Sequence, residues 1–201
     1  GIYSSGIFAL WEVAKEFGQA CVVAPESQKS AVGHGITISK PLFINNIKRS
    51  NGFEGHAVSG SPADCVKVGI KRILNKKPDL ILSGINLGSN LGNNIIYSGT
   101  VGAAVGGRKL KYPPVAISVA SYVTENTDFI VNKSLELVNA ITKLPSDFVG
   151  KVININFPDL SEEDCKGIKI TGLAQRDIPS KPIEVDSNSN KKKYRYNPVS
   201  Y

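Results

Sequence analysis

A glycine-rich polar segment is the part of this sequence best suited to chemistry. Residues 83–104 read SGINLGSNLGNNIIYSGTVGAA, with glycines four positions apart at Gly84, Gly88 and Gly92, and with asparagines and a Ser-Gly-Thr sequence around them. Glycine lets the backbone approach an anion, and the first N–H groups of a following helix favour negative charge. The segment is therefore typical of a phosphate-binding turn, although a plain surface loop has a similar composition. Its spacing fits neither a Walker loop nor a dinucleotide-binding fingerprint.

Helical and strand patterns alternate on both sides of this segment. The pattern predicts helices at residues 7–17, 61–73, 99–110 and 129–141, and strands at residues 21–25, 36–47, 80–85, 115–120, 152–157 and 168–170. Alternation of this kind is typical of an α/β protein with a doubly wound, Rossmann-like parallel sheet. Ligands of such sheets bind beyond the carboxyl ends of the strands. The polar loop at residues 26–35 and the glycine-rich segment both follow strands at that edge, so we expect them to converge.

Three local patterns add to this prediction. Ser61, Pro62 and Asp64 form a helix start, in which the carboxylate of Asp64 caps the helix. His34 lies in the polar loop and is either an acid of the site or a solvated side chain. Tyr97 is suited either to the core or to stacking on a base.

The bulk properties fit one α/β core with an appended arm. The chain has 201 residues, 41% of them hydrophobic, and its formal net charge of +7 favours anionic partners. It contains neither an apolar run of about 18 residues nor a basic leader, so no membrane partner is expected. The three cysteines are widely spaced and odd in number, and they favour a reducing, cytoplasmic location.

The carboxyl-terminal part of the chain is less regular. Residues 186–193 are polar and low in complexity, which predicts a partly flexible arm. Residues 191–196 read KKKYRY, and this basic run with interleaved aromatics is either a solvated surface loop or a nucleic-acid contact. The surface loop is the expected reading, so no specific nucleic-acid partner is assigned.

The chain resembles the SurE family of nucleotidases, also known as survival protein SurE, over nearly its whole length. The residues that carry the resemblance are the SGIN, NLG and YSGTV sequences within residues 83–101, VAP at 23–25 followed by Ser30, GSPADCV at 60–66, and Arg176-Asp177. The resemblance implies a doubly wound α/β fold with a carboxyl-terminal arm that is used in homodimers and homotetramers. It also implies a metal-dependent phosphomonoesterase that acts on nucleoside 5′- and 3′-monophosphates, with some members cutting short polyphosphate.

The resemblance also assigns site residues. It places Ser30 and Asn86 as ligands of a divalent metal, Mn²⁺ or Mg²⁺, and Asn90, Ser98, Gly99 and Thr100 as phosphate-binding groups. The family's two metal-binding aspartates precede a Gly-Ile pair that corresponds here to the first two residues, so the catalytic residues are expected upstream of Gly1. By the same correspondence, residues 1–158 are expected to form a core without its first strand, and residues 159–201 the start of the arm.

Three hypotheses for function follow. The first is a nucleotidase whose amino-terminal strand is missing from the sequence as written. The second is a catalytically inactive module that binds nucleotide or phosphate, because Ser30 and Asn86 are neutral ligands that offer a hard cation no charge. The third is a basic nucleic-acid-binding protein that uses residues 191–196.

Overall fold

The computed structural model describes residues 1–175, 182–188 and 191–195. The helices are α1 (Ser5–Lys15), α2 (Pro62–Val68), α3 (Gly99–Gly106) and α4 (Thr127–Ile141), with a π-helical turn η1 (Gly69–Ile73) and 3₁₀ turns η2 (Gly92–Tyr97) and η3 (Ser146–Phe148). The strands are β1 (Val22–Pro25), β2 (Ile44–Lys48), β3 (Glu54–Val58), β4 (Leu82–Leu87), β5 (Val115–Val119), β6 (Ile153–Phe157), β7 (Ile183–Asn188) and β8 (Lys191–Arg195).

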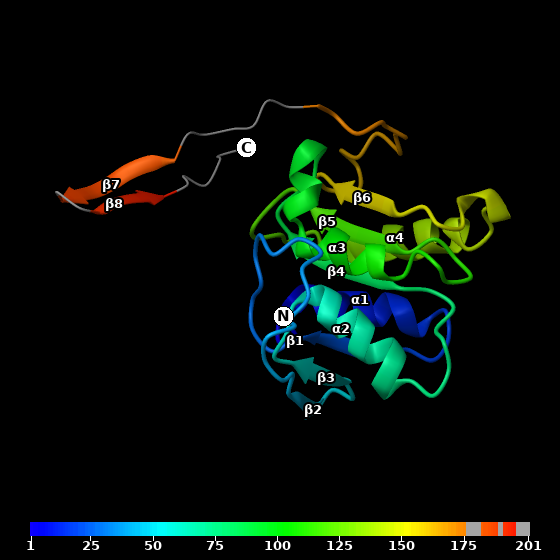
Figure 1. Ribbon diagram of the computed structural model, residues 1–201. Coiled ribbons are helices and arrows are strands. Elements are labelled where there is room, and N and C mark those ends of the chain that lie inside the picture. The colour runs from blue at the N-terminus through cyan, green and yellow to red at the C-terminus, as the bar shows by residue number, and fades with distance from the viewer. Residues whose placement is uncertain (176–181, 189–190, 196–201) are drawn as a thin grey trace.

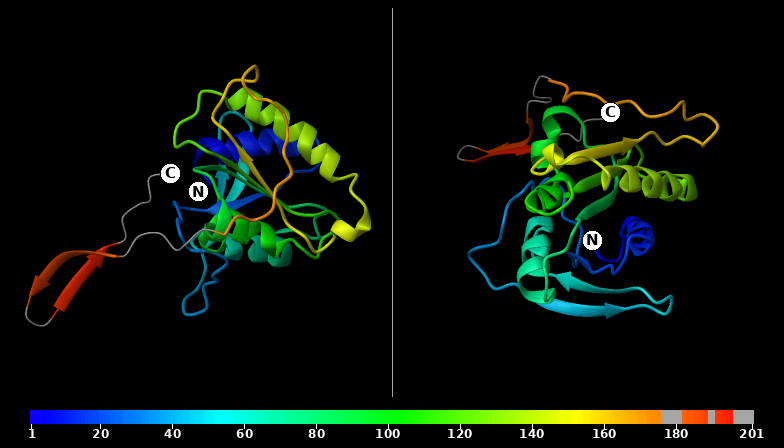
Figure 2. Two further views of the ribbon diagram at one scale, coloured as in Figure 1. Left: turned by 90° about the horizontal axis from the view of Figure 1, so that it is seen from above. Right: turned by 90° about the vertical axis from the view of Figure 1, so that its right-hand side faces the viewer.

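The body of the protein is a parallel α/β layer with helices on both faces. The strands form two groups of three, in the orders β1-β3-β2 and β4-β5-β6. All pairs in these groups are parallel except the edge pair β2–β3. Helices α1 and α4 cover one face, and α2 and α3 cover the other (Figures 1 and 2). This arrangement confirms the predicted doubly wound α/β fold.

Strand β5 is the centre of the second group and of the main core. All five of its residues are buried, as expected for a parallel strand covered on both faces. The core around it includes residues of α1, α4 and β6, and Phe129 packs edge-on against Phe157. A smaller cluster centred on Ile2, Val22 and Phe53 holds the first group together.

Helix α1 begins and packs as its sequence dictates. The Ser4 hydroxyl accepts a hydrogen bond from the backbone N–H of Ile7 at 3.3 Å, which caps the helix. Its buried face is formed by Gly6, Ala9, Leu10 and Val13. Phe17, which the periodicity assigned to this helix, lies beyond its end and is 40% exposed, because the helix stops at Lys15.

Three predicted elements differ from the structure. Residues 168–170 form no strand, and only Ile44–Lys48 of the expected strand at 36–47 is a strand. Strand β3 was not predicted; it pairs with β2 around a turn at Gly52, where φ is +82°. Pairing on both sides of β3 compensates for the low strand propensity of its Glu-Gly-His-Ala-Val sequence.

The basic run at 191–196 is a strand rather than a loop over its described part. Residues 191–195 form β8, which pairs antiparallel with β7, and its side chains are exposed. The hairpin extends away from the body (Figure 1). Tyr196 lies outside the described residues.

Candidate functional site

The amino terminus of α3 forms the centre of the site. Ser98 is the N-cap, and its buried hydroxyl accepts the backbone N–H of Val101 at 3.1 Å. The N–H groups of Gly99 and Thr100 belong to the first turn, where a helix has no internal acceptors for them. Together with the helix dipole, these groups form an anion-binding end. The structure therefore places three of the four expected phosphate-binding residues on one helix start.

Asn90, the fourth expected phosphate-binding residue, fixes the turn to the sheet. Its backbone N–H donates to Oδ1 of Asn156 at 2.8 Å, and its carbonyl accepts hydrogen bonds from the side chains of Asn154 and Asn156. Its Nδ2 donates to the hydroxyl of the fully buried Ser118 at 2.7 Å. Nδ2 carries a second hydrogen that remains suited to a phosphate oxygen.

These anchoring partners were missed by reasoning from the sequence. Asn154 and Asn156 lie two positions apart on β6, so they share one side of the strand. The signal in the sequence is the alternation Ile-Asn-Ile-Asn at 153–156, in which polar residues interrupt an otherwise apolar strand.

Asn86 lies at the end of β4, close to the same point. It is the register partner of Ser118, so Asn86 and Asn90 meet across that one serine. Nδ2 of Asn86 donates to the carbonyl of Gly88 at 2.6 Å, which leaves Oδ1 as the atom able to bind a cation. Gly88 has φ of +102°, and the exposed ring of Tyr122 lies directly against it.

The loop at residues 26–35 reaches the same edge from β1. Its Gly33 donates a backbone hydrogen bond to the carbonyl of Tyr97 at 2.9 Å, and the carbonyl of Lys29 lies beside Gly99. Ser30 is exposed on this loop, and its hydroxyl accepts a hydrogen bond from the side chain of Gln28 at 3.3 Å. The two polar loops thus converge as expected.

His34 also joins the loop to α3. Its Nδ1 donates to the carbonyl of Gly102 at 2.5 Å, while the side chain as a whole is exposed. A histidine held through Nδ1 in this way has Nε2 left for contact with solvent or substrate. The structure gives His34 a role in positioning the loop.

Asp64 fixes the far side of the loop, as its capping pattern predicted. Its carboxylate accepts hydrogen bonds from the N–H and hydroxyl of Thr37 and from the N–H of Ser61, and it is 3% exposed. Burial acts to raise the pKa of Asp64, but these hydrogen bonds outweigh it and hold the pKa below its usual range. The carboxylate is therefore ionised at neutral pH and acts as a structural anchor.

The metal-ligand set is incomplete in the described part of the chain. Ser30 and Asn86 offer neutral oxygen atoms of the type that Mg²⁺ and Mn²⁺ accept, but these cations need carboxylates to offset the loss of water. No group of three or more His, Cys, Asp or Glu side chains suited to a metal occurs among the described residues. These residues alone do not fit a divalent cation, so no chemical step is derived through one.

The fold and these strand-end loops define an α/β protein with an anion site at the carboxyl edge of a parallel sheet. The family described as Survival protein SurE matches residues 1–180, and the chain belongs to that family. Within the described part of the chain, no helix has both the length and the apolar character needed to cross a membrane.

Named relatives support the family assignment. The chain is 42% identical over 171 residues to the protein named 5′-nucleotidase SurE of Syntrophus aciditrophicus (strain SB), covering 85% of this chain and 64% of that relative. It is 37% identical over 197 residues to the protein of the same name from Clostridium botulinum (strain 657 / Type Ba4), covering 95% of this chain and 77% of the relative. The chain thus spans less than two thirds of the Syntrophus protein.

A solved structure supports the fold. The crystal structure of the SurE protein from Aquifex aeolicus matches with a TM-score of 0.78 and 38% sequence identity. The match covers 97% of this chain and 77% of the other chain.

Proposed function

We propose that this protein is a 5′-nucleotidase that hydrolyses nucleoside monophosphates to nucleoside and phosphate. The observation that carries the proposal is the convergence of the Ser98 helix cap, the Asn90 anchor and the loop of Ser30 at one edge of the sheet. The names of the relatives support the same activity. We extend the proposal to 3′-monophosphates, which carry the same phosphomonoester group.

The residues of this chain bind and orient the substrate phosphate. The N–H groups of Gly99 and Thr100 donate to its oxygen atoms, and the hydroxyl of Thr100 is a further donor at the same turn. The helix dipole favours the dianion, and the net charge of +7 favours its approach. Asn90 adds its second Nδ2 hydrogen from the opposite side of the turn.

The nucleoside is proposed to lie over the exposed aromatic side chains beside the phosphate. Tyr122 is 73% exposed and packs against Gly88, and Tyr97 is 56% exposed directly before the Ser98 cap. The exposure of Tyr97 excludes its alternative role in the core. A base stacked on either ring would place its 5′-phosphate within the same edge of the sheet.

A divalent cation, Mn²⁺ or Mg²⁺, is proposed as the cofactor, with Ser30 and Asn86 as two of its ligands. The carboxylates that such a cation requires are proposed to lie directly upstream of Gly1. The 201-residue chain alone is therefore expected to bind metal weakly and to catalyse poorly.

The remaining organisation is proposed on weaker structural support. Residues 1–158 are proposed as the body, since β6 ends at Phe157, and residues 159–201 as the start of an arm. The hairpin β7–β8 exposes Ile183, Val185 and Tyr194, which supports a homodimer or homotetramer formed through the arm. The odd number of widely spaced cysteines supports a cytoplasmic location.

The test is phosphate release from a nucleoside 5′-monophosphate in the presence of Mn²⁺. The 201-residue chain is compared with the same chain extended at Gly1 by an apolar strand that ends in Asn-Asp-Asp, and with a matched extension that ends in Asn-Asn-Asn. Activity that appears only with the aspartates supports the proposal. The absence of both hydrolysis and nucleotide binding in all three proteins overturns it.

A second function is favoured by one specific observation. Because the described residues contain a phosphate-binding helix start but no carboxylate cluster, the chain by itself fits a module that binds nucleotide without turning it over. Saturable nucleotide binding with no phosphate release from the Asn-Asp-Asp extended protein would make this the correct function.

A further inference from the structure

The sheet of this protein is interrupted between β1 and β4. Strand β1 pairs with β3, and β4 pairs with β5, so each has one strand neighbour within the described residues. The other edges of β1 and β4 face the same gap. Because both strands run parallel to their neighbours and their carboxyl ends meet at the site, the two edges have the same direction.

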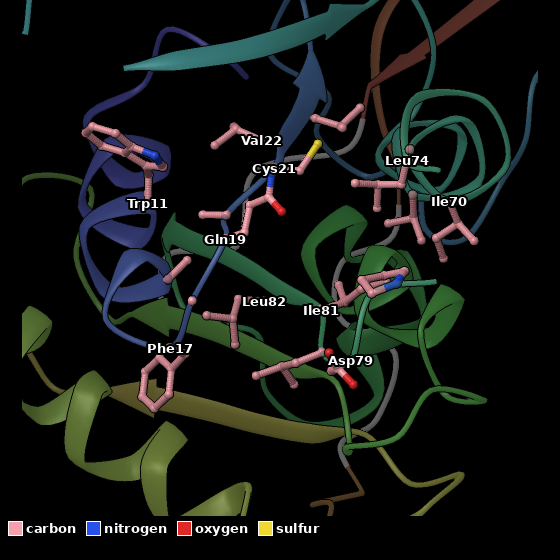
Figure 3. A pocket seen from close by; sticks show the side chains of 18 of the residues that line it. Trp11, Phe17, Gln19, Cys21, Val22, Ile70, Leu74, Asp79, Ile81 and Leu82 are labelled. Atoms are coloured by element: carbon pink, nitrogen blue, oxygen red, sulfur yellow. The ribbon is translucent and has the colours of Figure 1, made fainter. Parts of the chain in front are cut away.

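A cavity of about 360 Å³ fills the amino-terminal half of this gap. Figure 3 shows its walls: Trp11 of α1 stands opposite Leu74, with Val22 of β1 on a third side and Ile81 and Leu82 on the fourth. The walls are mainly apolar and come from both faces of the sheet. A segment in this position would therefore be covered on two sides by apolar residues, as a central parallel strand is.

The first residues of the chain already continue the edge of β1. The backbone N–H of Ile2 donates to the carbonyl of Pro25 at 2.8 Å, and the Ile2 side chain is fully buried beside Val22. Backbone groups of alternate residues point to the same side of a strand, so the groups of Val23 and Cys21 face the gap as that of Pro25 does. The Ile2–Pro25 hydrogen bond is thus the last rung of a parallel ladder.

The amino group of Gly1 marks the end of the gap. Burial lowers the pKa of this group, and it lies beside the carboxyl end of β1, close to the carbonyls of Pro25 and Ser27. On the other side, Gly6 of α1 lies so close to the carbonyl of Ile85 that a side-chain carbon at Gly6 would collide with it. The gap is closed at its carboxyl end by residues 1–6 and is open at its amino-terminal end.

We propose that this gap is an acceptor site for one extended apolar peptide strand. The strand runs parallel to β1 and β4 and ends at the amino group of Gly1. Five residues at about 3.3 Å each span about 16 Å, which matches strands of four and six residues on its two sides. A strand is favoured over a compact apolar ligand because it alone supplies partners for two rows of backbone groups that are costly to leave unpaired.

This inference does not depend on the proposed nucleotidase activity, because its test measures peptide binding. The probe is the acetylated, amidated peptide Lys-Ile-Val-Val-Val-Ser, and the matched control is Lys-Ile-Pro-Val-Pro-Ser. Proline removes the N–H groups that a central strand must donate. Trp11 is the single tryptophan of the chain and lines the cavity, so its fluorescence reports occupancy.

The expected result is saturable quenching or a spectral shift of Trp11 fluorescence with the first peptide, at least about tenfold tighter than with the proline control. Amide exchange at Val23 and Leu82 is expected to slow when the first peptide binds. Equal binding of both peptides would show a general apolar pocket and would overturn the proposal. Protection that depends on protein concentration in the absence of peptide would assign the gap to a second copy of the chain.

A covalent version keeps the proposal testable if the isolated chain is poorly folded. The two peptides are fused, each in its own protein, directly before Gly1. The apolar fusion is expected to unfold at a temperature several degrees above that of the proline fusion. Equal melting temperatures would overturn the proposal.

Discussion

The buried carboxylate of Asp64 provides the sharpest test of how the site is held together. It joins two segments that are distant in sequence, since it accepts hydrogen bonds from Thr37 in the loop that follows Ser30 and from Ser61 at the start of α2. The substitution Asp64→Ala removes the acceptor for three donors, two from Thr37 and one from Ser61. The loop is then expected to lose its fixed position relative to α2.

The expected loss can be estimated from these contacts. Each donor left without a partner costs at least about 1 kcal/mol, so Asp64→Ala should lower the free energy of unfolding by about 3 kcal/mol. For a domain of this size that corresponds to a fall in melting temperature of about 6–12 °C. The assay is thermal unfolding followed by Trp11 fluorescence. Asp147→Asn is the matched control, since Asp147 is exposed and its change should stay within about 0.5 kcal/mol.

The pH dependence gives a second measurement on the same residue. Because the folded pKa of Asp64 lies below its value in the unfolded chain, the carboxylate stabilises the fold fully at neutral pH. That stabilisation is lost as the pH falls through the folded pKa, below about 4. The stability difference between the native chain and Asp64→Asn should therefore be largest near pH 7 and should shrink below pH 4. A difference that is constant with pH, or a loss under about 1 kcal/mol in Asp64→Ala, would refute this reasoning.

Three further substitutions test the site itself. Ser98→Ala should cost about 1 kcal/mol of stability and weaken phosphate binding in titration calorimetry, whereas Ser98→Asn, which keeps a cap, should retain most of the stability. Tyr122→Ala should weaken binding of a nucleoside monophosphate while leaving inorganic phosphate unchanged; an equal effect on both ligands would argue against base stacking. Gly102→Ala would place a side-chain carbon against the carbonyl of Gly33, and should destabilise the protein by about 1–3 kcal/mol in chemical denaturation, whereas Gly172→Ala, in open space, should not.

The elements of the fold were predictable where the sequence carries a strong periodic or capping signal. Helix α2 begins at Pro62 as the Ser-Pro-Ala-Asp sequence predicts, and β5 matches the apolar run at 115–120 within one residue. Strand β3 could not be predicted, because its five residues include one β-branched side chain and their pairing depends on partners 30 residues upstream. The basic run of β8 is a strand for the same reason, since its pairing with β7 outweighs its polar composition.

The candidate site was partly predictable. The glycine spacing and the Ser-Gly-Thr sequence identify the helix start at Ser98 from local physics alone. The roles of Ser118, Asn154 and Asn156 depend on strands 30 to 60 residues away, and nothing in the local sequence shows which of them Asn90 contacts. The sequence also predicts that the loop of Ser30 reaches this edge, but its docking through Gly33 and His34 is visible only in the structure.

The most direct measurement of the central claim is a ¹H–¹⁵N nuclear magnetic resonance titration of the 201-residue chain with a nucleoside 5′-monophosphate. The phosphate is predicted to bind the amino terminus of α3, so the largest and saturable shifts should occur at the backbone amides of Gly99 and Thr100. The same titration of Ser98→Ala should show weaker binding at the same amides. Shifts confined to residues 191–195 would contradict the assignment and would identify the basic hairpin as the anion-binding surface instead.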